Sequence, residues 1–499
     1  MEIELKLAIN PDHHDRFRRH PLLRRISHQQ RTLHSVYFDT PGFDLFHRRI
    51  ALRLRRVEER WIQTLKAETR SVGALTSRPE WEMTVADGNQ PDFTALPVEA
   101  LELLAGIEHR RVVPVFTTEF QRITWLVGND DEQAEVALDT GKIIAGESNR
   151  TISEVEIELK SGAAEFLFET AQRLLRHVPL QIEPRSKAER GYLLCGAMTA
   201  SPVKFNRPAF EKNPLAGAVW HATMQAALVH LTANVPGFLE QPHHAEYLHQ
   251  VRVAVRRLLT AIAVGKPFRK TVSGFNQPLR QLMITSNPAR DWDVFQHEIL
   301  PMTLTTLETP DGDSGVDEIV LDRLYHAAAQ ARQQAQAVLS KPAFTQLILG
   351  LGRNLLSLPA DDQQRQAKSW AQAVLDARWQ RLLERGQNFA KLSDAGRHET
   401  RIAAKKLRYA IDIFAPVYPP KHTDRFISTL SALQDELGTT NDRVIARRLL
   451  QKLPKRTASI SFALGQMSGV LQCQAKQTAR ISHAIWEELL ASKLFWRQI

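Results

Sequence analysis

The spacing of apolar residues changes once along this chain, and that change limits what the chain can fold into. In residues 1–195 apolar and charged residues alternate with a period of two, as in Glu2–Leu7 and Glu154–Leu159, which predicts half-buried β-strands. From about residue 215 to residue 499 apolar residues recur every three or four positions, which predicts helices. The sequence therefore predicts an antiparallel α+β domain followed by an all-α domain.

A proline-punctuated stretch separates these two regions. Pro202, Pro208 and Pro214 lie within it, and such a composition is typical of a linker. The length of 499 residues suits about three domains of ~150 residues. We predict a first domain over 1–200, a linker over 201–214 and a helical domain over 215–499. The helical domain is expected to consist of two pseudo-repeats, roughly 215–320 and 321–499.

The sequence shows no pattern typical of a signal peptide, a membrane helix or a disulfide framework. The segment Met1–Lys6 is charged from its second residue, unlike the apolar region of a signal peptide. No uncharged apolar run approaches the ~18 residues of a membrane helix. Cys195 and Cys473 are too far apart to indicate a disulfide framework, and no cysteine pair has metal-site spacing. We expect a cytoplasmic protein without membrane contact.

Positive charge is concentrated in the second region. Residues 1–200 carry 27 Lys and Arg against 30 Asp and Glu, whereas residues 201–499 carry 38 against 25. The formal charge of +10 therefore combines a net −3 with a net +13. Such an asymmetry predicts that the helical region has a polyanionic partner.

The polar faces of the predicted strands are almost wholly ionic. These faces comprise Glu2, Glu4 and Lys6; Arg53 and Arg55; Glu80 and Glu82; and Glu154, Glu156 and Glu158. Residues on one face of a strand stand ~7 Å apart, so Glu2 and Glu4 can both reach one hydrated cation. A polyphosphate with magnesium would explain the pattern, because cations bind its oxygens and carboxylates hold the metal. The competing explanation is a solvated face with ion pairs of ~0.2–1 kcal/mol each, which must be invoked on four or five strands.

The first region resembles the CYTH, or triphosphate tunnel metalloenzyme, superfamily. Its motifs occur in order and with similar spacing, beginning with the Glu2-x-Glu4-x-Lys6 signature. The others are Tyr37-Phe38-Asp39-Thr40, Leu52-Arg53-Leu54-Arg55, Thr64-Leu65-Lys66, Arg122, Ala137-Leu138-Asp139, Glu154-Val155-Glu156-Ile157-Glu158 and Ser186-Lys187-x-x-Arg190-Gly191-Tyr192. The resemblance covers roughly residues 1–195.

The resemblance implies an eight-stranded antiparallel barrel with a charge-lined tunnel open at both ends. Its triphosphate-binding residues would be Lys6, Arg53, Arg55, Lys66, Arg122, Lys187 and Arg190. Its ligands to Mg²⁺, with Mn²⁺ as the alternative metal, would be Glu2, Glu4, Asp139, Glu154, Glu156 and Glu158. Catalysis would depend above all on Glu2, Glu4, Lys6 and Lys66.

The implied activity is hydrolysis of inorganic triphosphate to pyrophosphate and phosphate. Six or seven cations in a confined tunnel would offset the roughly four charges of the substrate and leave little room for a nucleobase. Adenylate cyclase, hydrolysis of nucleoside or thiamine triphosphates, and a non-catalytic polyphosphate-binding scaffold stay open as alternatives.

The helical region contains a repeated basic motif. His249-x-x-Arg252-x-x-x-Arg256-Arg257-Leu258 matches His398-x-x-Arg401-x-x-x-Lys405-Lys406-Leu407, 149 residues farther on, and Arg290-Asp291 matches Asn441-Asp442. Spacings of three and four place His249, Arg252 and Arg256 on one helical face. Duplicated halves would bring two such faces together in a basic groove for a linear polyanion.

This region resembles the CHAD domain, a conserved-histidine helical domain, over roughly 215–499. The resemblance implies binding of inorganic polyphosphate by His249, Arg252, Arg256, Arg257, His398, Arg401, Lys405, Lys406 and Arg408. Ser286-Asn287 stand where Leu-Gly is usual in the first half. Asp291, Asp293 and Asp442 are expected to support basic side chains or cap helices rather than bind metal. Sequence-specific nucleic-acid binding is disfavoured, because the basic rows lack interleaved aromatic residues. The sequence does not determine an oligomeric state.

Overall fold

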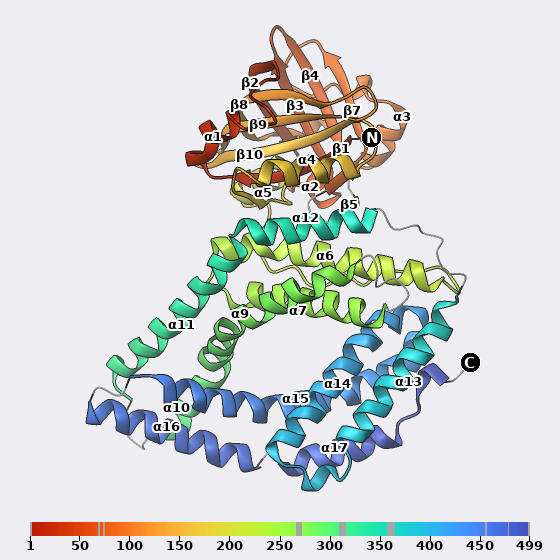
Figure 1. Ribbon diagram of the computed structural model, residues 1–499. Coiled ribbons are helices and arrows are strands. Elements are labelled where there is room, and N and C mark those ends of the chain that lie inside the picture. The colour runs from red at the N-terminus through yellow and green to blue at the C-terminus, as the bar shows by residue number, and fades with distance from the viewer. Residues whose placement is uncertain are drawn as a thin grey trace. The chain divides into compact units, whose positions relative to one another are not determined.

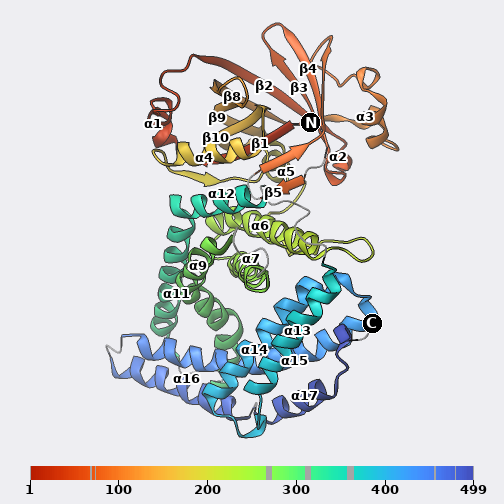
Figure 2. The same cartoon turned by 45° about the vertical axis from the view of Figure 1, so that its right-hand side comes forward.

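The protein is described from a computed structural model, shown in Figures 1 and 2. The described residues are 2–67, 70–72, 75–265, 272–308, 316–356, 365–454, 457–477 and 479–497. The chain divides into two compact units, each treated separately below. Unit 1 comprises Met1–Val203, Leu228–Gly237 and Ser340–Leu358, and unit 2 comprises Lys204–Ala227, Phe238–Leu339 and Pro359–Ile499.

Unit 1 is built on a single antiparallel sheet (Figure 1). Its strands are β1 (Glu2–Ile9), β2 (His28–Asp39), β3 (Ala51–Val57), β4 (Arg60–Lys66), β5 (Arg70–Val72), β6 (Leu75–Arg78), β7 (Glu80–Val85), β8 (Val113–Gly128), β9 (Gln133–Ala145), β10 (Ser148–Ser161) and β11 (Leu180–Ile182). Their order is β5-β6-β1-β10-β9-β8-β2-β3-β4-β7, with β11 also paired to β1. Eight of these described strands have six or more residues, and the other three are short.

The pairing register places the charged side chains on one face of this sheet. Lys6 is opposite Glu156, and Glu154 is opposite Asp139. Because side chains opposite each other lie on the same face, the ionic faces of neighbouring strands are continuous. Five strands separate β1 from β4 in the hydrogen-bonded order, yet the Lys66 Nζ lies 2.8 Å from a Glu2 carboxylate oxygen. The sheet therefore curls around its charged face, and we call that face the inner face.

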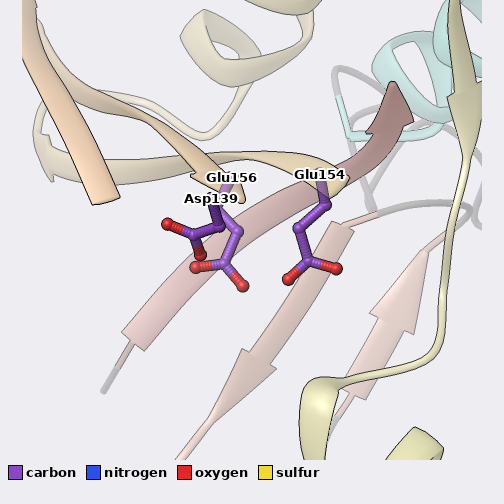
Figure 3. A group of neighbouring side chains, drawn as sticks. All are labelled: Asp139, Glu154 and Glu156. Carbon is purple, nitrogen blue, oxygen red and sulfur yellow. The ribbon is translucent and has the colours of Figure 1, made fainter. Parts of the chain in front are cut away.

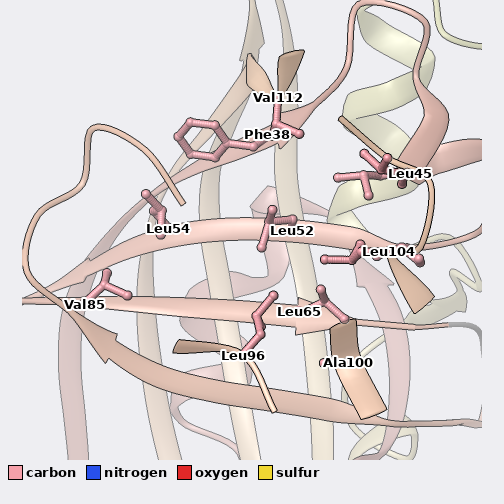
Figure 4. Packing of buried hydrophobic residues seen from close by; sticks show 12 residues of the cluster. Phe38, Leu45, Leu52, Leu54, Leu65, Val85, Leu96, Ala100, Leu104 and Val112 are labelled. Atoms are coloured by element: carbon pink, nitrogen blue, oxygen red, sulfur yellow. The ribbon is translucent and has the colours of Figure 1, made fainter. Parts of the chain in front are cut away.

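The outer face of β3, β4 and β7 is apolar and packs against a small helix. The cluster in Figure 4 joins Leu52, Leu54 and Leu65 of the strands to residues of α3 (Val98–Leu103) and its flanks, such as Ala100 and Leu104. Its leucines at positions two apart, such as Leu52 and Leu54, are fully buried. The alternation therefore reflects the two faces of the sheet: apolar side chains are buried on the outer face, and charged side chains lie on the inner face.

Five further helices lie wholly within the described part of unit 1. They are α1 (His14–Arg18), α2 (Asp44–His47), α4 (Glu165–Leu175), α5 (Lys187–Leu194) and α12 (Pro342–Leu356), and the short 3₁₀ turns are Pro11–His13, Phe93–Ala95 and His109–Arg111. The helix α4 packs against β1, β9, β10 and α12, and its buried residues include Leu167, Phe168 and Leu174. A capping box of Ser186 and Glu189 begins α5, which fixes where Lys187 leaves the backbone.

Gly141 marks a close approach of β9 to β8. A Cβ atom at this position would lie 2.1 Å from the Glu119 carbonyl oxygen and 2.5 Å from the Phe120 Cα. We expect Gly141→Ala to destabilise the protein by about 2–3 kcal/mol, because a neighbouring backbone must move. Thermal unfolding should show a melting temperature lower by about 5–10 °C. Gly42→Ala is the control, since its nearest neighbouring atom would be 3.8 Å away. Equal melting temperatures would contradict the close approach.

Unit 2 is helical, as its sequence period predicts. Its helices are α6 (Ala216–Glu240, partly in unit 1), α7 (Ala245–Val264), α9 (Asn276–Val294), α10 (Leu300–Leu307), α11 (Glu318–Leu339), α13 (Ala367–Arg385), α14 (Asp394–Phe414), α15 (Pro420–Lys452), α16 (Ala458–Gln477) and α17 (Ala479–Ala491). A π-helical turn spans Phe295–Ile299, and 3₁₀ turns span Ser273–Phe275, Phe389–Lys391, Ala415–Val417 and Phe495–Arg497. Among the described helices, none is long and apolar enough to span a membrane.

The two copies of the repeated motif lie on corresponding helices. The first copy runs from α7 to α9, and the second from α14 to α15. Each pair packs together, and α7 also packs against α14; α13, α14 and α15 lie side by side in both views (Figures 1 and 2). Val251, Val255 and Leu258 bury one side of α7, so its basic residues are left on the remaining side. The predicted order of an antiparallel strand region followed by a helical region is confirmed.

Candidate functional site

Three carboxylates meet on the inner face of the sheet in unit 1. Asp139 comes from β9, and Glu154 and Glu156 come from β10 (Figure 3). One oxygen atom of each lies within 4.8 Å of the others. Asp139 and Glu154 are inaccessible to solvent. Because like charges in a buried site repel one another strongly, this carboxylate cluster requires cations around it.

The cations around the carboxylate cluster come from β8 and α5. Arg122 donates to both oxygens of Asp139, at 2.7 and 2.6 Å, and also pairs with Glu156. Lys187 places its Nζ 2.6 Å from Asp139 and 3.0 Å from Glu156, and it also pairs with Glu154. Arg190 pairs with Glu154. The Lys187 ammonium group thus occupies the position of one small cation held by three carboxylates.

These contacts keep Asp139 and Glu156 ionised. Burial raises the pKa of Glu156, but Lys187, Arg122 and Lys6 together hold it well below the usual value. The pKa of Asp139 is also lowered, because Arg122 and Lys187 outweigh the effect of burial. The same ion pairs raise the pKa of Lys187, although its burial alone would lower that pKa. Oxygen-rich, ionised clusters of this kind suit hard divalent cations such as Mg²⁺ and Mn²⁺.

A second acidic group lies on β1. Glu2 accepts from Lys66 at 2.8 Å and from the Nε of Arg78 at 2.8 Å, while Glu4 accepts from the Nη2 of Arg78 at 2.7 Å. Lys66 is also 2.9 Å from Glu80. Burial raises the pKa of Glu2, but Lys66 and Arg78 hold it far below its usual value. Glu2 and Glu4 are therefore paired with these cations and are not members of the Asp139–Glu154–Glu156 cluster.

Arg55 is the cation of this face that has the most to gain from an anion. Its Nε donates to the Ser35 hydroxyl at 2.9 Å, and its guanidinium group lies 5.8 Å from the Phe120 ring centroid. Within the described part of the chain it forms no ion pair with a carboxylate. Burial, and then Arg53 and Arg122, lower its pKa to about 9. A phosphate oxygen beside it would relieve this repulsion.

A different polar site lies in unit 2, between α7 and α14. A cavity of about 490 Å³ is lined by His249, Arg256 and Arg257 from α7 and by Arg408 and Tyr409 from α14. Arg256 and Arg408 lie over the Tyr409 ring, 5.6 and 5.0 Å from its centroid. Neither pairs with a carboxylate among the residues that the structure describes. The cavity therefore has an excess of positive charge.

Two family models match the chain. The CYTH domain model matches residues 1–192, and the CHAD domain model matches residues 222–451. The chain carries a CYTH domain followed by a CHAD domain. The inner face with its carboxylate cluster belongs to the CYTH domain, and the basic cavity is lined mainly by the CHAD domain.

Similar proteins are known for each domain. An inorganic triphosphatase from Haemophilus influenzae is 36% identical over 194 residues, which are 39% of this chain and 54% of that protein. The chain thus spans about half the length of this relative. The crystal structure of the CHAD domain from Ricinus communis is 28% identical, with a TM-score of 0.49, and covers 59% of this chain and 98% of that one. A candidate adenylyl cyclase from Hippeastrum, described as having a dominant triphosphatase activity, is 19% identical with a TM-score of 0.29 and covers 38% and 95%.

Most residues predicted for the CYTH site share the inner face. Lys6 lies 3.5 Å from both Glu4 and Glu156, and Arg53 lies 3.6 Å from Glu82. Of the six carboxylates predicted as metal ligands, the structure brings together Asp139, Glu154 and Glu156. Glu158 instead pairs with the partly exposed Lys160 at 2.8 Å.

Sequence reasoning missed Arg78 in the CYTH domain. It belongs to β6, a strand of only four residues, which is too short to show the alternation that predicted strands such as β1 and β10. Its Nη2 donates to Glu4, and its pKa is raised by Glu4 and Glu2 despite burial. The only sequence signal was its position, two residues before Glu80 in the acidic strand that follows.

Some of the basic residues predicted for the CHAD domain have partners within the domain. Arg252 is hydrogen-bonded to α9, where it donates to the Met283 carbonyl, the Ser286 hydroxyl and the Asn287 side chain at 2.6–2.9 Å. Ser286-Asn287, which depart from the usual family pattern, thus hold this arginine. In the second repeat Arg401 lies 3.7 Å from Asp442.

The two histidines of the repeated motif differ in their surroundings. Burial, and then Arg290, lower the pKa of His249 to about 4, so its imidazole is neutral at pH 7. His398 pairs with Asn441 through its Nδ1, at 3.1 Å. Lys406 is exposed, whereas Lys405 is partly buried beside the cationic residues. His249 therefore adds no positive charge to the arginines around it at pH 7.

Proposed function

We propose that the CYTH domain hydrolyses inorganic triphosphate to pyrophosphate and phosphate with the help of a divalent metal, and that the CHAD domain binds inorganic polyphosphate. The observation that carries the first part is the convergence of the Asp139, Glu154 and Glu156 carboxylates on the same inner face as Arg55. The name of the Haemophilus relative supports the choice of substrate. We place the protein in the cytoplasm, where its two free cysteines would stay reduced.

The cations of the inner face supply the binding energy for triphosphate. Seven cations among the described residues lie beside the carboxylates of this face: Lys6, Arg53, Arg55, Lys66, Arg122, Lys187 and Arg190. Arg55 would take a phosphate oxygen directly. Arg122 and Lys187 already form charge-assisted contacts, so they would divide their donors between carboxylate and phosphate oxygens. Such a fixed array stabilises charge that develops on the transferred phosphoryl group.

Asp139, Glu154 and Glu156 would hold Mg²⁺ or Mn²⁺, since their oxygens converge, and the Lys187 ammonium group that lies among them would move to a phosphate oxygen. The bound metal would neutralise phosphate charge and the charge of the leaving group. The remaining carboxylates of the inner face would orient the attacking water, and no serine or cysteine nucleophile is needed. Glu2 and Glu4 hold Lys66 and Arg78 in place, which gives them a positioning role.

A phosphate-release screen tests this function. The purified full chain is supplied with triphosphate, pyrophosphate, ATP or long-chain polyphosphate, with Mg²⁺, with Mn²⁺ or with excess chelator. We expect phosphate release from triphosphate that requires metal, and slower release from ATP because the base must be accommodated. Formation of cyclic AMP from ATP as the main reaction would favour a cyclase. Absence of hydrolysis with every substrate would favour a binding scaffold.

The polyphosphate assignment rests on the cations at the α7–α14 cavity that lack carboxylate partners in the described residues. The aromatic rings there already hold guanidinium groups, so contacts to a phosphate backbone are favoured over base stacking. Competition between polyphosphate and double-stranded DNA at matched salt tests this choice. Tighter binding of DNA would contradict it.

A further inference from the structure

The basic cavity of unit 2 has a wall that neither copy of the repeated motif provides. Lys204, Phe205 and Arg207 line it together with α7 and α14. This segment has no helix or strand and lies before residue 222, where the match to the CHAD model begins. In sequence it reads as part of a linker. In the structure it adds two positive charges to the cavity.

The segment is fixed to both repeats through one buried carboxylate. Asp412 of α14 accepts from Arg207 at 3.1 Å and from Arg257 of α7 at 3.0 Å, each through a different oxygen. The Asp412 side chain is only 3% exposed, whereas that of Arg207 is 47% exposed. Because a single carboxylate holds two arginines, the pair keeps a net positive charge and a defined orientation.

Phe205 contacts Arg257 through its aromatic ring. Its ring centroid lies 3.9 Å from the guanidinium carbon of Arg257. Stacking on an aromatic ring leaves the edge donors of a guanidinium group available for hydrogen bonds. The Arg257 Nε is buried and has no hydrogen-bond partner among the described residues, and the Nε of Arg256 is in the same state. Two arginines of the cavity thus have unused donors.

We propose that Lys204, Phe205 and Arg207 form part of the polyanion site of the CHAD domain, with Lys204 and Arg207 binding phosphate directly. Phe205 and Asp412 are positioning residues that hold the Arg257 and Arg207 guanidinium groups. The inference rests on the proposed polyphosphate function and extends that site beyond the family match. A linear chain of inorganic phosphates suits it, because the cations follow one another around the cavity and no free aromatic face is required.

The test compares two double variants of the full chain that lose the same charge. Lys204→Gln/Arg207→Gln changes the cavity wall, and Lys421→Gln/Lys493→Gln removes two exposed lysines that do not line the cavity. Binding of long-chain polyphosphate is measured at several salt concentrations. Each lost phosphate contact should reduce the salt slope by ~0.7–0.9, as in nucleic-acid binding. We expect the cavity variant to bind about five- to tenfold more weakly with a shallower slope, and the control to change less than twofold.

The outcomes separate this inference from the function on which it rests. Failure of the unaltered protein to bind polyphosphate would overturn both. Normal binding by the unaltered protein, with identical affinities and slopes for the two double variants, would overturn the inference alone. Phe205→Ala should weaken binding about threefold without changing the salt slope, and Phe205→Tyr should restore it. An unchanged affinity of Phe205→Ala would overturn the positioning role. Thermal unfolding of each variant shows whether unit 2 stays folded.

Discussion

Replacing Glu156 by glutamine is expected to reduce metal-dependent triphosphate hydrolysis by about 10²- to 10³-fold. Glu156 is a member of the Asp139–Glu154–Glu156 cluster and contacts Lys6, Arg122 and Lys187. Glutamine keeps the size of the side chain but removes the charge that would hold a divalent cation. The measurement is the rate of phosphate release as a function of metal concentration. Half-maximal activity should require at least about tenfold more Mg²⁺.

Glu158→Gln provides a matched control for this experiment. Glu158 lies two residues farther along β10 and pairs with the partly exposed Lys160, so we expect at most about a twofold change. Removing one member of a buried ion pair can cost ~3–5 kcal/mol in stability, so thermal unfolding must accompany the kinetics. Glu156→Asp retains the charge and should recover part of the activity. If Glu156→Gln is folded and hydrolyses triphosphate at the normal rate and metal concentration, the proposed metal site is wrong.

The strand and helix pattern of the CYTH domain was largely predictable from sequence. The alternating ionic faces predicted strands within β1, β3, β7 and β10. These elements are half-buried, so one face carries a clear signal. Alternation did not reveal the long strands β2 and β8, nor β5, β6 and β11, which have three or four residues each. Their position depends on pairing with distant strands rather than on their own pattern.

Side-chain partnerships were harder to predict than the face on which they occur. The sequence placed Glu2, Glu4, Glu154 and Glu156 on charged faces, but it could not show that Arg78 would pair with the first two. Those contacts depend on the antiparallel pairing of β6 with β1, which sets Arg78 opposite Glu2. In the CHAD domain the repeat predicted two basic faces, and α7 does pack against α14.

The same difficulty applies to the segment before the CHAD domain. Its prolines predicted a linker, and it has neither helix nor strand. Yet Phe205 and Arg207 contact α7 and α14 through Arg257 and Asp412. A single aromatic residue and a single arginine have no periodicity, so no sequence pattern could reveal these contacts. Irregular segments that bind through individual side chains can be recognised only in three dimensions.

Lys405 gives the basic site of the CHAD domain a proton-dependent component. Burial is the largest cause that lowers its pKa to about 7, followed by Arg401 on its own helix and Arg256 on α7. Arg408 adds to this effect, while Asp442 on α15 opposes it. In the free protein Lys405 is therefore about half protonated at pH 7. A bound phosphate chain would stabilise the charged form and raise this pKa.

Polyphosphate affinity is therefore expected to fall as the pH rises. The complex binds more protons than the free protein above pH 7, so binding takes up close to one proton and affinity falls by up to about tenfold for each pH unit. Between pH 6 and pH 9 the expected loss is about 30- to 100-fold if the pKa of Lys405 in the complex returns to about 10. Calorimetry in two buffers with different ionisation enthalpies measures the proton uptake directly.

Lys405→Arg tests whether this residue is the source of the pH dependence. Arginine stays charged up to pH 9, so this variant should bind polyphosphate with nearly constant affinity and take up no more than about 0.2 proton at pH 8. Lys406→Arg is the control, because Lys406 is the exposed neighbour and should leave the pH profile unchanged. Proton uptake that persists in Lys405→Arg would assign the effect to another group. The pH profile thereby distinguishes a buried lysine, which must be charged by its ligand, from a basic surface that is always charged.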